Sequence, residues 1–341
     1  MYHSFFWLRL LAGLFTERTG KRILKISRLA VRLGQVLLFF VVGYYLIYRN
    51  LVLNWQALAE QQWSFRLFPF MASLVAVAII FALNSQIWRM IVFALSGKHL
   101  KAGRAAYIWF ISNLGRYLPG KVWQLAGMAV LARREGVSAV GATASAIIGQ
   151  VVHLLAGAAV GLYFLPTELT GAFAPLAHWA WLGLPPVIIF LYPPLLRKLL
   201  SLASRWSGKP PVEVNLKLRD LVVWFSLNVL VWLAYGCCFY YFVKAIYPQG
   251  DLSLAAAIGV YAVGYIIGFL VIFAPGGLGV RETMFAGLLT AVLGEVGATV
   301  TALGSRIWLT LAELVPVVLV LIAGGLPAFE QNDLETGRQD E

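Results

Sequence analysis

The chain has 341 residues, of which 60% are hydrophobic and only 12% charged, and its mean hydropathy is +0.80. Soluble domains contain about 45–50% apolar and about 25% charged residues, so this composition excludes a disordered chain and an ordinary soluble enzyme. It indicates a protein that crosses a membrane several times. The net charge is nevertheless +12, so the basic residues must lie at membrane surfaces or inside a helical bundle.

Residues 1–32 form a basic N-terminal segment that contains seven lysines and arginines. An apolar stretch precedes these basic residues, and no small-residue cleavage site follows, so a cleavable signal peptide is not expected. An amphipathic helix at the membrane surface fits the pattern better. Positive charge collects on the cytoplasmic side of membrane proteins, so we expect this segment to be cytoplasmic.

Six apolar stretches approach the length of about 20 residues that a helix needs to cross a bilayer. They cover about 33–48, 68–95, 139–164, 179–196, 220–243 and 300–325. The connections 96–104 and 197–219 are basic, whereas 165–178 has no lysine or arginine. This alternation predicts a multi-pass protein of the cell membrane, plasma or inner, with both termini in the cytoplasm.

Two further apolar stretches, 105–132 and 254–293, are interrupted by turn-forming residues. Proline removes a helical hydrogen bond and glycine tolerates turns, so each stretch should break at its Pro-Gly. At 1.5 Å per residue, about 14 residues on each side of the first break span about 20 Å, which is too short to cross the bilayer. We therefore predict two re-entrant helical hairpins. The residues that form the breaks are Pro119 and Gly120, and then Pro275, Gly276, Gly277 and Gly279.

The two breaks lie 156 residues apart, and a shift of 156 places the spans of the first half near those of the second. Each half is predicted to contain two spans, a broken hairpin and a further span. The first half would start on the cytoplasmic side of the membrane and the second half on the opposite side. Interrupted helices at equivalent positions of an inverted repeat indicate a binding site near the bilayer midplane. We therefore expect an all-α polytopic membrane protein with about six full spans and two re-entrant hairpins. A single domain would cover 33–325, with halves at about 33–164 and 179–325, followed by an acidic tail at 326–341.

Charged residues inside apolar segments are candidates for function, because each costs at least about 2.5–3.5 kcal/mol to insert. Arg116 and Lys121 flank the first break, and Arg281 and Glu282 follow the second. A helix that starts after a break directs free N–H groups and the positive end of its dipole toward the break. Together these groups predict a cationic pocket for a phosphate or carboxylate.

Structural roles compete with this interpretation. Arg116 and Lys121 can reach the membrane surface from a shallow hairpin. Arg281 and Glu282 are adjacent, so their side chains should diverge on a helix and find other partners. Arg306 and Glu313 would then pair with Glu282 and Arg281 across helices. The polar candidates that complete the substrate-binding set are Asn113 and Gln124 beside the first break, and Gln150 and His153 on the following span.

The motifs around the two breaks resemble the membrane domain of the lysylphosphatidylglycerol synthase/flippase family. They read NLGRYLPGKVWQLAGMAVLARREG from Asn113 and FAPGGLGVRETMFAGLL from Phe273. The resemblance covers about 30–325 and includes free-standing flippase-like proteins and archaeal relatives linked to lipid-carried sugars. It implies a bundle with re-entrant helices that moves a lipid headgroup between leaflets.

Two departures from the family pattern bear on the substrate. Many relatives have an arginine soon after the first Pro-Gly and an acidic residue in the next span, where this chain has Gly127-Met128 and Gln150 with His153. These departures imply a headgroup that differs from that of the relatives and is not aminoacylated. Only a short acidic tail follows Leu326, so we do not expect a synthase domain or lipid aminoacylation.

Three functions remain open at this stage. The first is a flippase or transporter of an anionic or phosphate-bearing lipid, either a phospholipid or a polyprenyl-linked one. The second is a membrane enzyme of lipid-linked sugar or glycosyl transfer, for which only Glu282 and Glu313 offer carboxylates within apolar segments. The third is a partner that supports a membrane synthase or glycosyltransferase. The +12 charge follows from membrane orientation, so no nucleic-acid partner is needed, and no catalytic residue is expected.

Overall fold

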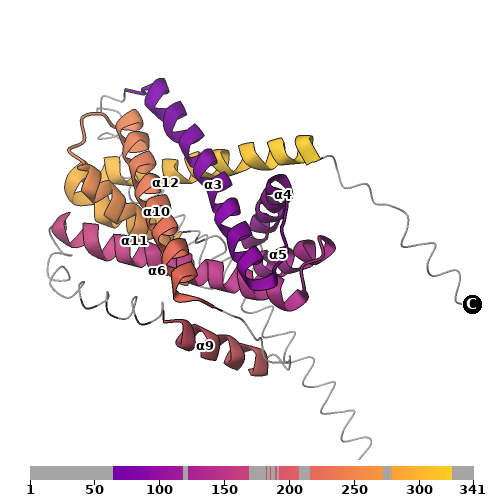
Figure 1. The fold of residues 1–341 in the computed structure, drawn as a ribbon. Helices are drawn as coiled ribbons and strands as arrows, with labels where there is room; N and C mark the ends of the chain where they lie inside the picture. The colour runs from indigo at the N-terminus through magenta and orange to yellow at the C-terminus, as the bar shows by residue number, and fades with distance from the viewer. Residues whose placement is uncertain are drawn as a thin grey trace, which may run out of the picture.

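The computed structural model describes residues 64–117, 122–168, 192–206, 216–271 and 279–324, together with the single positions 182, 185, 189 and 277. The described elements are helical, as expected, and no strand occurs among them (Figure 1). The longer elements are α3 (Leu67–Ser96), α6 (Ala139–Glu168), α10 (Leu218–Ile246) and α12 (Val280–Gly324). The shorter ones are α4 (Ala102–Asn113), the 3-10 turn η2 (Leu114–Tyr117), α5 (Val122–Arg134), α9 (Pro193–Trp206) and α11 (Leu254–Leu270).

Four of the described helices, α3, α6, α10 and α12, are long and apolar enough to cross a membrane. Large apolar side chains remain exposed along α3, such as Phe68 at 85% and Ile79 at 56%, and along α12, such as Ile322 at 75%. Such outward-facing apolar surfaces are suited to lipid rather than water. The chain is therefore a multi-pass membrane protein. The expected span at 33–48 lies outside the described residues.

Helices α4 and α5 form an antiparallel pair on either side of the first break. Arg104 near the start of α4 donates from Nε to Glu135 Oε1, just after α5, at 2.8 Å. At the other end of the pair, Gln124 donates to Asn113. Between these contacts, a side chain at Gly127 would meet Ser112 Oγ at 3.1 Å. The chain thus reverses direction between α4 and α5, whereas Pro119 and Gly120 lie outside the described residues.

Helix α11 and the start of α12 form a second antiparallel pair around the second break. A Cβ at Gly264 would collide with the ring of Phe285, and one at Gly268 would lie 2.9 Å from the Cβ of Arg281. The two backbones therefore approach closely because both positions lack a side chain. Gly277 and Gly279 have φ angles of 71° and 80°, in the left-handed region that favours glycine.

Helix α12 changes direction at Gly294, which has φ 70° and ψ 170°. The residues before Gly294 belong to the second antiparallel pair. Residues 295–324 form a long apolar helix that contains the expected span at 300–325 up to residue 324. A shift of 156 residues carries the bounds of α6 onto 295–324. The same shift carries α4 and α5 to within a few residues of α11 and of the first part of α12.

Helix α9 was not expected from the sequence. Its first residues were predicted to end the span at 179–196, and the rest were predicted to lie in the basic connection at 197–219. It is amphipathic, with leucines such as Leu195 and Leu196 alternating at helical spacing with Arg197 and Lys198. Leu196 is buried against the bundle, whereas Arg197 and Lys198 are exposed. Most of the predicted span at 179–196 lies outside the described residues.

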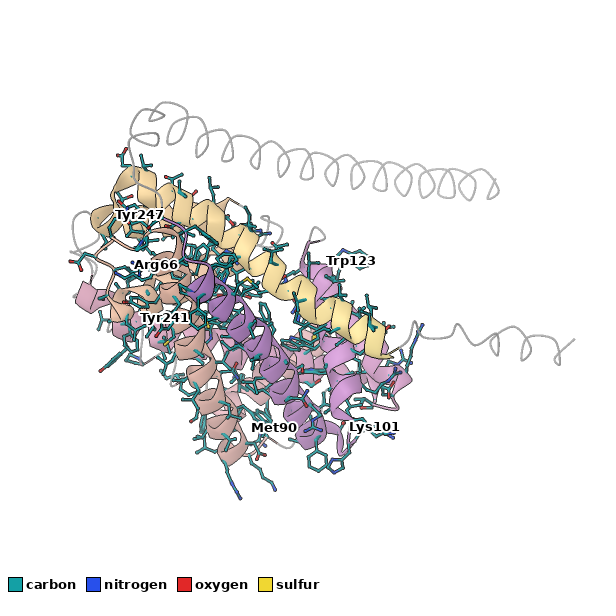
Figure 2. The ribbon with its side chains drawn as sticks, turned by 90° about the horizontal axis from the view of Figure 1, so that it is seen from above. Arg66, Met90, Lys101, Trp123, Tyr241 and Tyr247 are labelled. Atoms are coloured by element: carbon teal, nitrogen blue, oxygen red, sulfur yellow. The ribbon has the colours of Figure 1, made fainter. Side chains whose placement is uncertain are left out.

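Two clusters of buried apolar side chains hold the described helices together. The larger joins α3, α6, α10, α11 and α12 around Trp232, Phe239 and Trp308. The smaller packs the α4–α5 pair onto α3 and α6 around Trp88 and Met128. In the larger cluster α3 and α10 lie side by side and antiparallel, since the N–H of Arg66 donates to Ala245 O at one end (Figure 2).

Candidate functional site

A cavity with polar and charged groups in its wall lies where the two apolar clusters meet. Its empty volume is about 1100 Å³ with its opening included, a size suited to a small-molecule or headgroup ligand. Both antiparallel pairs contribute to its wall, through Asn113, Arg116 and Gln124 from the first and Gly268, Gly277 and Arg281 from the second. The four long helices supply the rest, apart from Trp109 of α4 and from Tyr265 and Phe269 of α11. The cavity thus joins the two breaks that the sequence singled out.

Each long helix contributes from near its middle. Asn84 and Trp88 come from the inner part of α3, Gln150 and His153 from α6, and Tyr235 from α10. Arg306, Thr310 and Glu313 lie near the centre of residues 295–324. Polar groups at the centre of apolar helices would be costly next to lipid, so their convergence on one cavity satisfies them internally.

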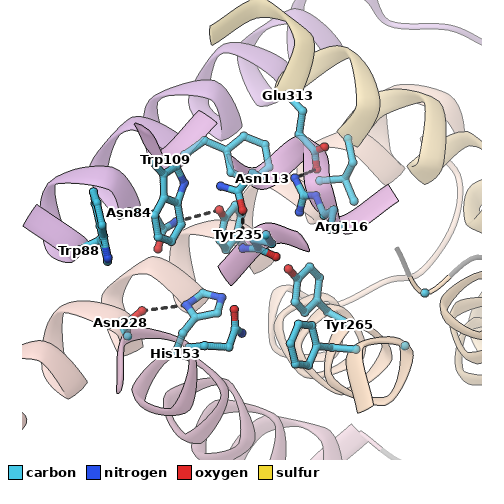
Figure 3. A pocket seen from close by; sticks show the side chains of 18 of the residues that line it. Asn84, Trp88, Trp109, Asn113, Arg116, His153, Asn228, Tyr235, Tyr265 and Glu313 are labelled. Atoms are coloured by element: carbon cyan, nitrogen blue, oxygen red, sulfur yellow. Dashed lines mark hydrogen bonds and ion pairs between the residues drawn. The ribbon is translucent and has the colours of Figure 1, made fainter. Parts of the chain in front are cut away.

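The first charged group at the cavity is an ion pair between Arg116 and Glu313. Arg116 Nη2 lies 2.7 Å from Glu313 Oε1, and the two side chains are 21% and 14% exposed. This pair joins the turn after α4 to the second part of α12 (Figure 3). Arg116 therefore lines the cavity and pairs within the bundle. The expected pairing of Glu313 with Arg281 is replaced by this contact.

The second charged group centres on Glu282. Its Oε1 lies 3.7 Å from Arg281 Nη2 and 3.7 Å from Arg306 Nη1. The expected pairing with Arg306 is therefore confirmed. The expectation that Arg281 and Glu282 diverge is wrong, because Glu282 is at the third helical position and turns back, accepting the N–H of Gly279 at 2.7 Å. This contact is one half of a capping box, because Gly279 has no side chain to complete it, and it brings the carboxylate beside Arg281.

These contacts set the charge of the site. Arg281 and Glu282 are only 7% and 4% exposed, and Arg281 Nε has no hydrogen-bond partner among the described residues. Counting the described residues, three arginines face two glutamates, so one positive charge is in excess. Because Glu282 already occupies the start of α12, the arginines offer more attraction to an anion than the free N–H groups of that helix.

The opposite side of the cavity is uncharged and rich in amides and aromatic rings (Figure 3). His153 Nδ1 lies 2.8 Å from Asn228 Oδ1, and Asn84 donates to the Tyr235 hydroxyl at 2.9 Å. The indole of Trp232 stacks on His153 at a centroid distance of 4.8 Å and donates to the backbone oxygen of that residue at 2.8 Å. These contacts fix the imidazole ring, as expected for an interhelical hydrogen bonder.

The predicted site residues fall into three groups. The cavity wall contains Asn113, Arg116, Gln124, Gln150, His153, Gly277, Arg281, Arg306 and Glu313. Two others, Glu282 and Gly279, are at the start of α12 and do not belong to this wall. Glu282 contacts Arg281 and Arg306 and accepts the N–H of Gly279. The remaining predictions lie outside the described residues; these are Pro119, Gly120, Lys121, Pro275 and Gly276.

Several residues of the cavity wall were not among the sequence predictions. The polar ones are Asn84, Asn228, Tyr235, Tyr265 and Thr310, and the walls beside them include Trp88 and Trp109. A signal for two of them was present, because Asn84 and Asn228 are amides near the middle of stretches predicted to span the membrane. Applying the cost of polar groups in lipid to amides as well as charges would have selected them.

Comparison with known proteins gives one family. The family described as lysylphosphatidylglycerol synthase TM region matches residues 29–324. The matched range includes every described helix and both breaks. No curated protein shows significant sequence similarity to the chain.

Proposed function

Because the chain belongs to the family of lysylphosphatidylglycerol synthase transmembrane regions, we propose that it is a flippase that moves an anionic, phosphate-bearing lipid between leaflets. The family implies a lipid-related function in the membrane. The observation that carries the finer proposal is the cavity between the two antiparallel pairs. Among the described residues there, Arg116, Arg281 and Arg306 outnumber the two glutamates by one positive charge. A lipid phosphate would bind there while the acyl or isoprenoid chains remain in the bilayer.

The choice of arginine supports a phosphate ligand. A guanidinium group presents a planar fork that matches two phosphate oxygens, and it stays charged when buried. Arg281 and Arg306 share one carboxylate at 3.7 Å, a distance longer than a good charge-assisted hydrogen bond. A phosphate oxygen at about 2.8 Å would therefore be a closer partner than Glu282.

We also propose that the two antiparallel pairs are re-entrant hairpins of an inverted repeat. The matching bounds of α6 and residues 295–324 after a shift of 156 support this arrangement, as do the two breaks at one cavity. In this topology the N-terminus and the acidic C-terminal tail are cytoplasmic, and the protein lies in the plasma or inner membrane. The first hairpin would enter from the cytoplasm and the second from the opposite side.

Cysteine labelling tests this topology. All variants carry serine in place of the native cysteines. A single cysteine at exposed Lys101, before α4, or at exposed Arg134, at the end of α5, should react with a membrane-impermeant maleimide from the cytoplasmic side. A single cysteine at exposed Asp251, before α11, or at exposed Glu295, after Gly294, should react from the opposite side. If the two cysteine positions of one helix pair react from opposite sides of the membrane, that pair crosses the membrane and is not a re-entrant hairpin.

Reconstitution tests the function. Proteoliposomes with the purified full chain should move a fluorescent phospholipid or a polyprenyl-phosphate lipid between leaflets faster than protein-free vesicles of the same composition. The measurement is the fraction of label that an impermeant quencher reaches over time. If neither lipid class moves faster than in the protein-free vesicles, the flippase proposal is wrong.

The alternative is that the chain acts as a membrane partner or enzyme of lipid-linked sugar transfer. The two glutamates at the cavity favour this less, because both lie within 4 Å of arginines, whereas glycosyl transfer commonly uses carboxylates positioned at the reacting bond. Co-purification of a synthase or glycosyltransferase, with no lipid movement by the chain alone, would support the partner role.

A further inference from the structure

The two sides of the cavity differ in chemistry, and this difference restricts the headgroup. Arg116 lies on one side of the cavity, whereas Trp88, His153 and Asn228 lie on the other (Figure 3). Arg281 and Arg306 also line the cavity. A ligand that fills both sides carries its negative charge at one end and uncharged polar groups at the other. The following inference rests on the proposed lipid movement and concerns which headgroup is taken.

No carboxylate in the described part of the cavity is available to a cationic headgroup. Glu313 lies 2.7 Å from Arg116, and Glu282 lies 3.7 Å from both Arg281 and Arg306. An ammonium group would have to compete with a guanidinium for either carboxylate, and it would be repelled by the excess positive charge. Removing one member of such a buried pair leaves the other charge uncompensated, which is strongly unfavourable.

The uncharged side retains hydrogen-bonding capacity. Gln150 lines the cavity, and among the described residues its side chain has no hydrogen-bond partner. His153 uses Nδ1 for Asn228, which leaves its other ring nitrogen available to a ligand. An amide both donates and accepts, and so does a hydroxyl group, whereas an ammonium group only donates.

Two indole rings form the wall beside these groups. Trp88 and Trp109 lie with ring centroids 6.4 Å apart, and both line the cavity. An indole offers a broad apolar face, which suits the C–H surface of a polyol or sugar between its hydroxyl groups. Amides can bind hydroxyl groups, indoles can pack on carbon faces, and arginines can bind a phosphate. One kind of ligand, a polyol phosphate, carries all three groups.

We propose that the transported headgroup is an uncharged polyol, glycerol or a sugar, joined to the lipid through a phosphate, and not an amine-bearing group. The phosphate binds among the arginines, and the hydroxyl groups bind beside Gln150 and His153. Both a glycerophospholipid and a polyprenyl phosphate sugar have this chemistry, and they differ only in the lipid chain that stays in the bilayer.

The test compares headgroups on the same labelled acyl chains in proteoliposomes of the full chain. Phosphatidylglycerol should move at least about tenfold faster than phosphatidylethanolamine. A separate experiment with a polyprenyl-phosphate hexose shows whether the lipid chain of the substrate is an acyl or a polyprenyl chain. Movement of the hexose alone, or of both polyol lipids, supports the proposal. Equal or faster movement of phosphatidylethanolamine overturns it but leaves the flippase function standing.

A binding measurement separates the headgroup inference from transport. Native mass spectrometry of the purified chain with equal amounts of phosphatidylglycerol and phosphatidylethanolamine should show a preference of about tenfold for the glycerol headgroup. If no lipid moves in vesicles but this preference is present, the headgroup inference stands and the transport proposal fails. If the purified chain binds the two lipids equally, the headgroup inference is wrong.

The substitution Gln150→Leu provides a second variant. It removes the unpartnered amide and keeps a similar volume, so the preference for phosphatidylglycerol should fall at least fivefold. The matched control is Gln86→Leu, which removes an amide of α3 that bonds Ser85 and the backbone of Ala102 and does not line the cavity. An unchanged preference in Gln150→Leu would remove Gln150 from the headgroup site.

Discussion

Replacing Arg281 with glutamine is expected to slow lipid movement by about 10- to 100-fold. Hydrogen bonds to charged groups contribute about 1.5–3 kcal/mol, and each 1.36 kcal/mol corresponds to a tenfold change in rate. Arg281 is 7% exposed and lines the cavity beside Gly277, so its guanidinium group is placed to contact a ligand there. The measurement is the initial rate of lipid movement in proteoliposomes containing equal amounts of wild-type or variant protein.

The control for Arg281→Gln is Arg104→Gln. Arg104 also pairs with a glutamate, Glu135, but its side chain is 46% exposed and lies at the far end of the α4–α5 pair. Exposed ion pairs contribute little, so this variant should keep its rate. Arg281→Lys should fall between the wild type and Arg281→Gln, because lysine keeps the charge without the two-pronged geometry. A wild-type rate in Arg281→Gln would exclude Arg281 from phosphate binding.

Replacing Gly236 with alanine is expected to destabilise the bundle by about 1–3 kcal/mol through overpacking. The added Cβ would lie 2.5 Å from the Cα of Ile258 and 2.8 Å from its Cβ, so the backbones of α10 and α11 would have to separate. These helices meet within the larger apolar cluster, where Tyr235 and Tyr261 are also packed. The measurement is the midpoint of thermal unfolding in detergent.

Gly103→Ala is the matched control for Gly236→Ala. Gly103 lies near the start of α4, and a Cβ there would meet no atom within 4 Å. Alanine favours helix more than glycine, so this variant should be as stable as the wild type or more so. If Gly236→Ala unfolds at the same temperature as Gly103→Ala, the close contact between α10 and α11 does not contribute to stability.

Much of the described fold was predictable because the cost of polar and charged groups in lipid leaves strong patterns in a sequence. The three spans at 68–95, 139–164 and 220–243 correspond to α3, α6 and α10, within five residues at each end. Arg116, Arg281 and Arg306 were selected because a charge within an apolar stretch is rare, and all three line the cavity.

The remaining features depend on information that a sequence pattern does not contain. The contact between Arg281 and Glu282 arises from the capping position of Glu282, which turns its carboxylate back to Gly279. The pairing of Arg116 with Glu313 depends on how the α4–α5 pair docks on α12. Helix α9 was missed because its first leucines continue the preceding apolar stretch. The sequence alone therefore does not show where a membrane span would end and the amphipathic helix begins.

The excess positive charge of the cavity has a consequence for energetics. Moving one elementary charge through a membrane potential of 100 mV changes the free energy by about 2.3 kcal/mol. Among the described residues the empty site carries one positive charge, so a headgroup with a single negative charge would make the loaded site neutral. The step in which the loaded site turns from one side of the membrane to the other would then be insensitive to voltage. The membrane potential would act on the step in which the empty, positively charged site turns back.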